Sequence, residues 1–536
     1  MKYLFLLTIT PVQDFISQAR KLKDLYGGSH ILSEMSRTGL ESAQKSAAEV
    51  IFPQNVKGSS SYPNRFLVEV SFDSEDELKT FAQNISDEVL EYFKDLNKSE
   101  SSIVKLHIEN FFQIYWSASE YSEDYKKAFD EVENRLAGAK NTRFFNQLGE
   151  VGRKCSICGE RNVAVYQKPM QFYIEEQRAN LVNAKKEDNL QKGEGLCGVC
   201  YLKRRSIKKG FDSTADIAIM NIPLEIRERY NFLNSESQLF YEENLTEDFF
   251  NKNDIDYPLS ECQNEFKAFK SDIREFKQSS YYAVVMFDGD DMGKWLSGQK
   301  LNDTSRLKEF HKDISLNLAT FAKKAKEILK EPKGMTVYAG GEDFLGFVNI
   351  NNLFDVLKEL NGQFSSLISE PLKEQYGLSD NFTFSAGVVI AHYKTPLGTV
   401  LNEARKSEKK AKNSSGKDSV CLTVLKRSGE IREVVIKHNK VEAIASIVLE
   451  LRDNFSDSFI SNLEREFLIM LDKDGNLNLR KSLLTTEIER LLKRSVKMEN
   501  ANVKNMKNLV STLYTKEFRH FTDALAIAKF INKEIE

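Results

Sequence analysis

The chain has 536 residues, a formal net charge of −3 and a hydrophobic fraction of 41%. These values are typical of a globular protein with several packed domains. They exclude a strong overall electrostatic attraction to nucleic acid, although a local basic patch is compatible with them. No run of about 20 apolar residues occurs, and the apolar start of the chain is too short for a signal peptide, so we expect a cytoplasmic protein with no membrane partner.

The first 145 residues predict an α+β domain of their own. Apolar and β-branched runs predict strands, and longer runs with apolar residues at helical spacing predict helices. The expected strands are 3–10, 65–72 and a segment within 103–116, and the expected helices are 12–48, broken at Gly27-Gly28, and 75–96. This alternation is compatible with a ferredoxin-like palm domain.

Two pairs of cysteines mark the next region, residues 146–275. Cys155 and Cys158 form one Cys-x-x-Cys pair, and Cys197 and Cys200 form the second. Two such pairs are typical of a structural zinc site with four thiolate ligands. The rival interpretation, disulfides or a redox dithiol, is disfavoured in a cytoplasmic protein.

The third region, residues 276–430, places acidic residues at the end of a predicted buried strand. Tyr281 to Phe287 is a continuous apolar run, as in a strand that is covered on both faces. The run ends at Asp288-Gly289-Asp290-Asp291. Acids clustered at the end of a central strand indicate either a solvated loop or part of a metal site, and a second group of acids favours the metal site.

That second group lies in the segment TVYAGGEDFLGFV, residues 336–348. Its two apolar arms predict a β-hairpin, and Gly340-Gly341 supply the positive φ angles that a tight turn favours. Glu342 and Asp343 then stand at the tip, where adjacent carboxylates repel each other unless a cation neutralises them. Together with Asp288 they predict a site for two Mg²⁺ or Mn²⁺ ions that assist phosphoryl transfer. Solvated acids on an ordinary hairpin are the alternative.

A strand and a helix complete the third region. Phe382 to Ala391 predicts a strand, and the helix that follows begins near Pro396 and has lysines at its far end. A lysine at this end, Lys409 or Lys412, can meet the oxygens of a triphosphate, although for any one of them a solvated basic helix is the favoured interpretation. From residue 431 to residue 536 the pattern is mainly helical, with apolar residues at helical spacing that predict a bundle.

A faint internal repeat connects the first and third regions. The segment YPNRFLVEV, residues 62–70, parallels YAGGEDFLGFV, so Asn64-Arg65 stand where Glu342-Asp343 stand. The strand that ends in the acidic cluster has a counterpart at the start of the chain with no acid at its end. The repeat predicts two palm domains, of which the first has lost its metal ligands.

Several motifs occur in one order along nearly the whole chain: ITPVQDFISQARKLKDLYGGSHILSEMSR, the two cysteine pairs, DGDDMG, GGED, and SAGVVIAHYKTPL followed by EARKSEKKAK. Together they resemble the large subunit of type III CRISPR effector complexes, the Cmr-type palm-domain protein of subtype III-B. The resemblance implies an α+β fold with two palm domains, a zinc-bearing helical region and a C-terminal helical domain. It also implies partners: the other subunits of a Cmr-type complex, guide RNA (crRNA) and target RNA.

The resemblance assigns roles to individual residues. It places catalytic metal ligation on Asp288, Glu342 and Asp343, with Asp290 as a further candidate. The residues that it implies for nucleotide binding are Gly340, Gly341, Ser385 near the base and Lys412 near the phosphates in the second palm, and Gln13, Arg20, Gly28 and Ser29 in the first palm. Helix packing is the alternative role for the last four.

The implied activity is that of an ATP-dependent nucleotidyltransferase. Target RNA activates it, and it makes an adenylate second messenger, commonly cyclic oligoadenylate. An alternative reaction joins ATP, as AMP, to S-adenosylmethionine. A catalytically silent scaffold subunit and a free-standing diguanylate cyclase that prefers GTP are two further alternatives.

Two departures from the family pattern bear on these expectations. The usual hairpin tip is Gly-Gly-Asp-Asp, whereas this chain has Gly-Gly-Glu-Asp, so one carboxylate reaches a methylene further. Many relatives begin with an HD nuclease domain, whereas this chain starts at the first palm, and none of its histidines is followed by aspartate. We therefore expect no DNase activity.

Overall fold

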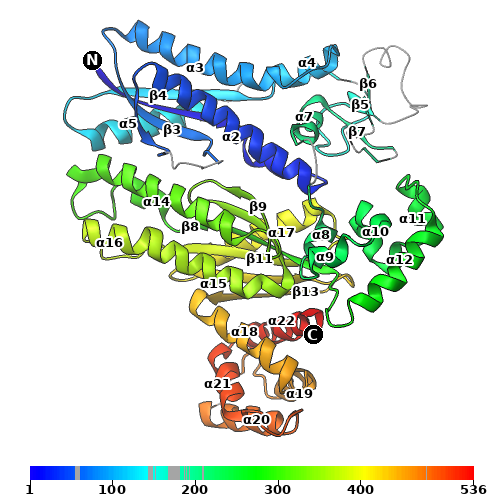
Figure 1. Cartoon of the computed structure of the whole chain (residues 1–536). Coiled ribbons are helices and arrows are strands. Elements are labelled where there is room, and N and C mark those ends of the chain that lie inside the picture. Colours follow the sequence, from blue (N-terminus) through cyan, green and yellow to red (C-terminus); the bar gives the residue numbers. More distant parts are fainter. Residues whose placement is uncertain are drawn as a thin grey trace.

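The computed structural model describes residues 1–54, 61–142, 149–150, 152–166, 181–185, 188, 190–191, 193–207, 211–477 and 480–535. Figure 1 shows two α/β lobes stacked on each other, the first in blue and cyan above the second in green and yellow. Helices α8 to α12 lie beside the second lobe, and the C-terminal helices extend below it. The fold class is α+β, as the sequence predicts.

The first lobe is built on a four-stranded antiparallel sheet in the order β2-β3-β1-β4. Its strands are β1 (Lys2–Thr10), β2 (Glu49–Phe52), β3 (Arg65–Ser71) and β4 (Gln113–Glu120). Its helices are α1 (Gln13–Ser17), α2 (Leu22–Lys45), α3 (Glu75–Asp95), α4 (Ser102–Glu109) and α5 (Tyr125–Asn141). Helices α2 and α3 cover one face, where Phe5 and Phe66 are buried, and α5 covers the other, where Leu4 and Leu6 are buried. Burial of both faces explains the continuous apolar run of β1.

The second lobe is built on a six-stranded sheet in the order β13-β12-β11-β8-β10-β9. Its strands are β8 (Tyr281–Gly289), β9 (Gly334–Ala339), β10 (Phe344–Asn349), β11 (Phe384–His392), β12 (Ser419–Leu425) and β13 (Ile431–Lys437). The associated helices are α13 (Met292–Leu296), α14 (Leu307–Ile328), α15 (Leu353–Phe364), α16 (Glu370–Tyr376) and α17 (Leu397–Lys412). Helices α14 and α15 cover one face of the sheet and α17 covers the other, so β8 is buried on both sides. The sheet runs on to Lys437, beyond the predicted boundary at residue 430.

The two lobes repeat one strand arrangement. In each, the second strand pairs with the third, the third with the first and the first with the fourth, counting β1 to β4 and β8 to β11 in chain order. The backbones also match in detail, because the Ile9 amide donates to the Asn64 carbonyl (2.9 Å) as the Gly289 amide donates to the Glu342 carbonyl (3.2 Å). Asn64 and Glu342 therefore occupy equivalent places, as the sequence repeat predicts.

A smaller module and a group of helices lie between the lobes in sequence. The module contains a three-stranded sheet and α7 (Gly198–Ser206); its strands are β5 (Val165–Tyr166), β6 (Val182–Asn183) and β7 (Gly195–Leu196). The helices that follow are α8 (Thr214–Ile219), α9 (Leu224–Arg227), α10 (Asn231–Ser235), α11 (Glu247–Lys252) and α12 (Leu259–Asp272). Helix α8 packs on β10 and β8, so this region adjoins the second lobe.

The predicted break at Gly27-Gly28 is wrong. Helix α2 continues through both glycines, and the interruption falls earlier, between Ser17 and Leu22. A Cβ atom at Gly27 would overlap the carbonyl oxygen of Lys203, and one at Gly28 would lie 3.2 Å from the Lys203 Cδ. The glycines are present because α7 packs against α2 at this point, which requires small residues and no break in the helix.

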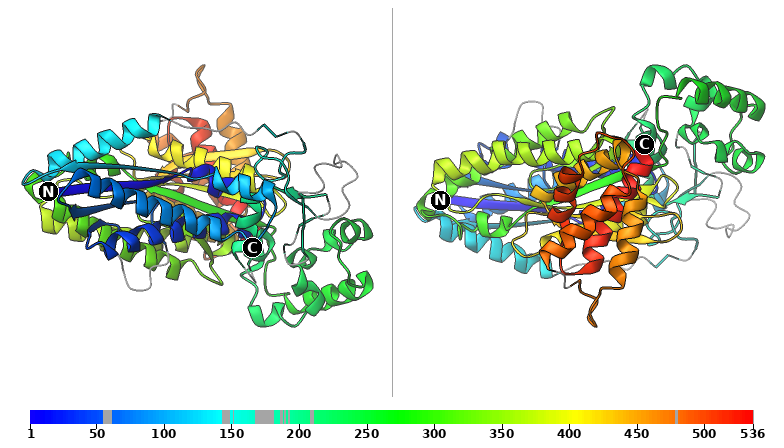
Figure 2. Two further views of the ribbon diagram at one scale, coloured as in Figure 1. Left: turned by 90° about the horizontal axis from the view of Figure 1, so that it is seen from above. Right: turned by 90° about the horizontal axis from the view of Figure 1, so that it is seen from below.

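The C-terminal region is a helical bundle, as predicted. Its helices are α18 (His438–Asp453), α19 (Ser458–Leu468), α20 (Lys481–Lys493), α21 (Val503–Leu513) and α22 (Phe518–Ile535). Figure 2 shows these helices, in orange and red, below the second lobe, while α2 and α3 lie over the first sheet in the view from above. Among the helices that the structure describes, none has the length and apolarity needed to span a membrane.

Candidate functional site

Three neighbouring strands bring the predicted acids together. Asp288 lies directly opposite Ser385 on β11, and Phe287 lies opposite Phe344, the residue that follows Asp343 on β10. Because opposite residues in an antiparallel pair point to the same face, Asp288 and Ser385 share the face of the sheet that α17 covers. The strand ends that carry the predicted acids therefore adjoin. Among the described residues, however, only the four cysteines form a group of three or more metal-ligating side chains within 4.8 Å of one another, so the acids do not form a closed cation cage in this structure.

The hairpin tip has the tight turn that the glycines predict, but of the two only Gly341 adopts the predicted positive φ. The Gly340 amide donates to the Asp343 carbonyl (3.1 Å), and Gly341 has a φ of 104°, which L-residues rarely adopt. A Cβ atom at Gly340 would overlap the ring of Tyr338. Both glycines are needed for a turn that places Glu342 and Asp343 next to the end of β8.

The hairpin carboxyls hold their protons more tightly than usual. Burial and the neighbouring Asp343 carboxylate raise the pKa of Glu342 to about 7, against a smaller lowering effect of Arg65. Burial raises the pKa of Asp343 to about 6. The Asp343 side chain itself is exposed, so enclosure by the neighbouring hairpin and strand end, and not full burial, raises its pKa. A cation at this position would favour the ionised carboxylates, so the donor set fits Mg²⁺ or Mn²⁺.

Helix α17 brings a lysine and a further acid to this face. A Cβ atom at Gly387 of β11 would overlap the backbone of Ala404 and Glu408, so the glycine permits close packing of α17 on the sheet. At the end of the helix, Lys412 forms an ion pair with Asp288, and its Nζ lies 3.6 Å from the Glu408 carboxylate. Burial and Lys417 lower the pKa of Lys412 to about 8.

Glu408 was not predicted from the sequence. Burial and the Asp343 and Asp290 carboxylates raise its pKa to about 7, so it belongs electrostatically to the same group of acids. The sequence feature that could have identified Glu408 is its position one helical turn before Lys412, which puts both side chains on the same face of the helix. Arg65 was also missed as a site residue, although the sequence repeat placed it at the tip of the first hairpin; it forms an ion pair with Glu133.

Asp290 is buried and partly satisfied. Its Oδ2 accepts hydrogen bonds from the Thr383 hydroxyl (2.7 Å) and from the Asp418 amide (3.1 Å), whereas its Oδ1 has no partner. The Ser385 hydroxyl is likewise buried without a partner. Two unpartnered oxygen atoms beside Asp288 are unusual in a folded protein and suit a site that receives a cation or a polar ligand.

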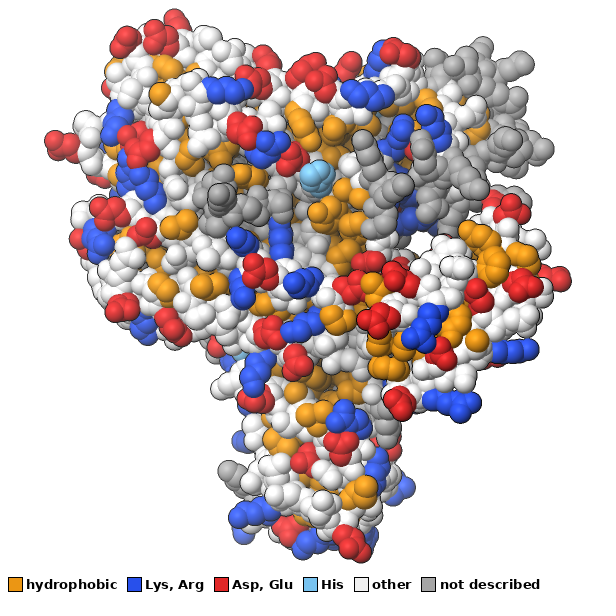
Figure 3. Space-filling view, in the orientation of Figure 1, with side chains coloured by type: hydrophobic (Ala, Val, Ile, Leu, Met, Phe, Trp, Pro, Cys, Tyr) orange, Lys and Arg blue, Asp and Glu red, His pale blue; other side chains and the backbone are white. Residues whose placement is uncertain are grey.

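The first-lobe candidates occupy separate environments. Gln13 is exposed at the start of α1, and the Arg20 guanidinium, about half exposed, lies 3.8 Å from Glu194. Gly28 packs against α7, which is the packing role weighed as its alternative. Ser29 is buried and lines a pocket of about 280 Å³ between α2 and β9. Figure 3 shows a hollow between the two lobes, with apolar side chains and one histidine at its upper rim.

The four paired cysteines form a cluster. The sulfur atoms of Cys155, Cys158, Cys197 and Cys200 all lie within 4.8 Å of one another. Four thiols at this spacing match the tetrahedral sulfur ligands of structural zinc, so the donor set fits Zn²⁺. With every coordination position filled by the protein, such a metal would have a structural role.

Comparisons with known proteins agree with this architecture. Residues 281–421 match the model of the Cas10/Cmr2 second palm domain, and residues 4–98 match that of the N-terminal part of CRISPR-associated protein Cmr2. The chain is 25% identical to the Cmr subunit Cmr2 of the Pyrococcus furiosus CRISPR system. That alignment covers 78% of this chain and 61% of the relative, so the chain spans less than two thirds of the relative's length.

Solved structures show the same fold. A cryo-EM structure of the type III-B Cmr-beta complex in the apo state contains a chain with a TM-score of 0.66 and 15% identity; the match covers 100% of this chain and 82% of the other. A chain of the same complex bound to cognate target RNA gives a TM-score of 0.63 at 14% identity, covering 94% and 79%. The acid-bearing sheet thus matches the Cas10/Cmr2 second-palm model and the first lobe matches the Cmr2 N-terminal model, so both lobes are similar to domains of the Cas10/Cmr2 family of CRISPR-associated proteins.

Proposed function

We propose that the chain is the signalling subunit of a type III-B CRISPR complex and that its second lobe joins adenylates from ATP when target RNA is bound. The observation that carries this proposal is the convergence of Asp288, Glu342 and Asp343, with Lys412 beside them, at the end of a sheet that the second-palm model matches. Likeness to chains of solved Cmr complexes supports the partners, namely guide RNA, target RNA and the other Cmr subunits.

The reaction is a transfer of an adenylate. An acceptor hydroxyl bonds to the α-phosphorus of ATP, the bond to pyrophosphate breaks, and the hydroxyl loses its proton. Metal ions held by Asp288, Glu342 and Asp343 would lower the pKa of that hydroxyl and stabilise the charge on the pyrophosphate. Lys412, now paired with Asp288, is the cation best placed to bind the triphosphate.

The first lobe contributes an acceptor-binding surface in this proposal. Its hairpin carries Asn64-Arg65 where the second lobe carries Glu342-Asp343, so it lacks the carboxylates for a second catalytic centre. The Arg65 guanidinium of this hairpin pairs with Glu133 and lies near enough to Glu342 to lower the pKa of that carboxyl slightly. An acceptor with phosphate or carboxylate groups suits this cation. The four cysteines hold a structural zinc ion, and the second lobe is the catalytic palm.

The test is mass spectrometry of the products of the assembled, target-bound complex. The complex receives ATP, GTP or ATP with S-adenosylmethionine, and a complex with Asp343→Ala is the control. Cyclic oligoadenylate from ATP alone supports the main proposal. A conjugate that requires S-adenosylmethionine identifies the alternative acceptor, and products from GTP alone indicate a guanylate cyclase. Unchanged nucleotides in every reaction, with target binding verified, overturn the proposal in favour of a scaffold.

A further inference from the structure

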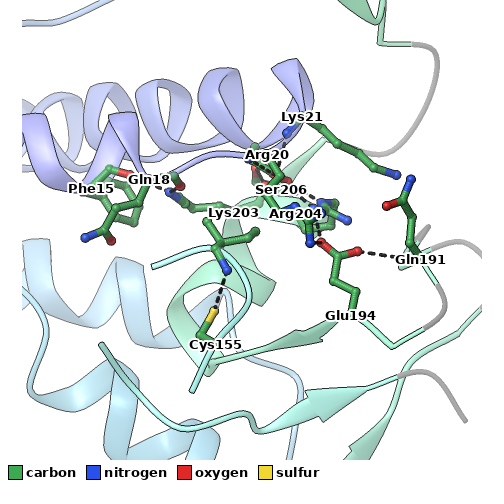
Figure 4. A network of polar contacts seen from close by, with 12 residues as sticks. Phe15, Gln18, Arg20, Lys21, Cys155, Gln191, Glu194, Lys203, Arg204 and Ser206 are labelled. Carbon is green, nitrogen blue, oxygen red and sulfur yellow. Dashed lines mark hydrogen bonds and ion pairs between the residues drawn. The ribbon is translucent and has the colours of Figure 1, made fainter. Parts of the chain in front are cut away.

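Two consecutive cations of helix α7 are completely buried. Lys203 and Arg204 each have 0% exposure, whereas charged side chains are almost never buried unless they are paired. Figure 4 shows both side chains between the module that carries the cysteines and the turn that joins α1 to α2. Their contacts explain how the chain tolerates this burial.

Lys203 holds the end of α1. Its ammonium group donates hydrogen bonds to the carbonyl oxygen of Phe15 (2.6 Å) and to that of Gln18, and it lies 5.0 Å from the centre of the Phe15 ring. These carbonyls belong to the last turn of α1, where they have no continuing helix to donate to them. Lys203 therefore satisfies backbone groups of a segment almost 200 positions earlier in the chain.

Arg204 holds the start of α2. Its Nη2 donates to the Asp24 carboxylate (2.9 Å), and the same atom lies 3.3 Å from Glu194. The Asp24 carboxylate in turn accepts hydrogen bonds from the amides of Arg20 and Lys21, each at 3.1 Å. This carboxylate satisfies orphan amides at the beginning of α2, as in a capping box. Together, Lys203 and Arg204 fasten both sides of the α1–α2 turn, residues 18–21.

Both cysteine pairs are connected to this turn. Lys203 and Arg204 follow Cys200 in the same helix, so the second pair is joined to the two cations through α7. From the other pair, Glu160, two residues after Cys158, accepts a hydrogen bond from the Gln18 amide side chain (2.7 Å). The position of the turn therefore depends on how the two pairs are held together.

The turn is also connected to the acid-bearing lobe. Ala19, in the turn, is buried in the same apolar cluster as Leu401 and Ala404 of α17, and Ile16 of α1 packs against that cluster. Helix α17 carries Lys412 at its end, where the lysine pairs with Asp288. Because the turn and α17 share one core, a displacement of the turn would shift the helix that carries Lys412.

We propose that metal binding by the four cysteines sets the conformation of the α1–α2 turn through Lys203 and Arg204. We further propose that Lys203 is a positioning residue for the nucleotide site; this second part rests on the proposed function. In the absence of the metal, α7 loses the restraint that keeps its two cations under the turn, and residues 18–21 open to solvent.

Amide hydrogen exchange of the full chain tests the first part. The test variant is Lys203→Met, which removes the ammonium group that donates to the Phe15 and Gln18 carbonyls. The control is Lys105→Met, which changes an exposed lysine on the neighbouring helix α4. We expect exchange of the amides between Phe15 and Leu25 to become at least about tenfold faster in Lys203→Met only, with zinc content unchanged and exchange in β8 and β11 unchanged.

Removal of zinc from the wild-type chain by a chelator should produce the same increase in amide exchange between Phe15 and Leu25. If Lys203→Met does not fold, this measurement on the wild-type chain tests the inference by itself. Unchanged exchange between Phe15 and Leu25 after zinc loss, or in folded Lys203→Met, overturns the inference whatever the activity is. The second part is tested by product formation in the complex, where Lys203→Met should lower the rate and Lys105→Met should not. A wild-type complex without product refutes the proposed function, while the exchange measurement still decides the first part.

Discussion

The two α/β lobes share their backbone arrangement but differ at the ends of equivalent strands. In the second lobe, Asp288, Glu342 and Asp343 gather where β8 and the β9–β10 hairpin end; in the first lobe, the equivalent places hold Thr8, Asn64 and Arg65. The hydrogen bond that closes each hairpin onto the first strand is retained in both. The fold therefore tolerates either set of side chains at the ends of these strands.

The difference also sets the electrostatic character of each lobe. The second lobe concentrates carboxyls with raised pKa values at its tip, whereas the first presents the Arg65 guanidinium, which is paired with Glu133. If the proposed function holds, only the lobe that keeps its acids carries the chemistry, and the other lobe keeps the fold without them. The five predictions below test this asymmetry and the packing that supports it.

The largest effect is expected from Asp343→Ala. We expect the rate of product formation from ATP in the target-bound complex to fall at least about hundredfold, because loss of a metal ligand costs more than the 10–100-fold that is typical of its outer-shell partners. The matched change in the first lobe is Arg65→Ala, which should have a clearly smaller effect. Equal losses in the two variants would contradict the assignment of catalysis to the second lobe.

Lys412→Met should lower the rate at limiting ATP by about 10- to 100-fold, since a hydrogen bond to a charged group contributes about 1.5–3 kcal/mol. The control is Lys410→Met on the same helix, where the lysine pairs with Glu433 (2.6 Å) instead of Asp288. Steady-state kinetics over a range of ATP concentrations separates binding from turnover. Similar losses for both lysines would indicate a general effect of positive charge on α17.

Gly387→Val should destabilise the second lobe by about 1–3 kcal/mol, because its side chain would collide with the backbone of α17. The midpoint of thermal unfolding measures this. Gly398→Ala is the control, since no atom lies within 4 Å of a Cβ at that position, and alanine in a helix is favoured over glycine. A stable Gly387→Val chain would mean that α17 is held less closely to β11 than the structure shows.

The smallest effect concerns pH. Because the pKa of Glu342 rises from 4.5 to about 7 on folding, the folded chain binds more protons than the unfolded chain between these values, and stability falls as the pH rises through about 7. Without divalent cations, Glu342→Gln should therefore gain about 2 °C or more in Tm relative to wild type between pH 5 and pH 8. Added Mg²⁺ should reduce this difference.

Glu49 in the first lobe should behave in the opposite sense. Lys312 and Lys308 lower the pKa of Glu49 from 4.5 to about 2, so its contribution to stability is present above pH 4.5 and is lost as the pH falls through about 2. The side chain is 46% exposed, so the effect of Glu49→Gln should be small and confined to ion pairing with α14. A common pH response in the two variants would contradict the different environments of the two lobes.

Local patterns in the sequence predicted the parts of the site that depend on neighbours in the chain. The apolar run before Asp288 and the Gly340-Gly341 turn identified the ends of β8 and of the hairpin, and the cysteine spacing identified the cluster. The continuous helix at Gly27-Gly28 could not be predicted, because its cause is α7, which lies far away in sequence. Glu408 was missed for the same reason: its role depends on the packing of α17 on Gly387.

The six-stranded sheet has two edge strands, β9 and β13. One is covered by a helix from the N-terminal part of the chain and the other by a helix from the C-terminal part. Helix α2 packs against β9, and α22 packs against β13. An uncovered edge strand presents free backbone groups that can pair with another chain and cause aggregation. Helix α2 is available early in synthesis, whereas α22 is made last, so a ribosome-bound or C-terminally truncated chain would carry β13 as an exposed edge.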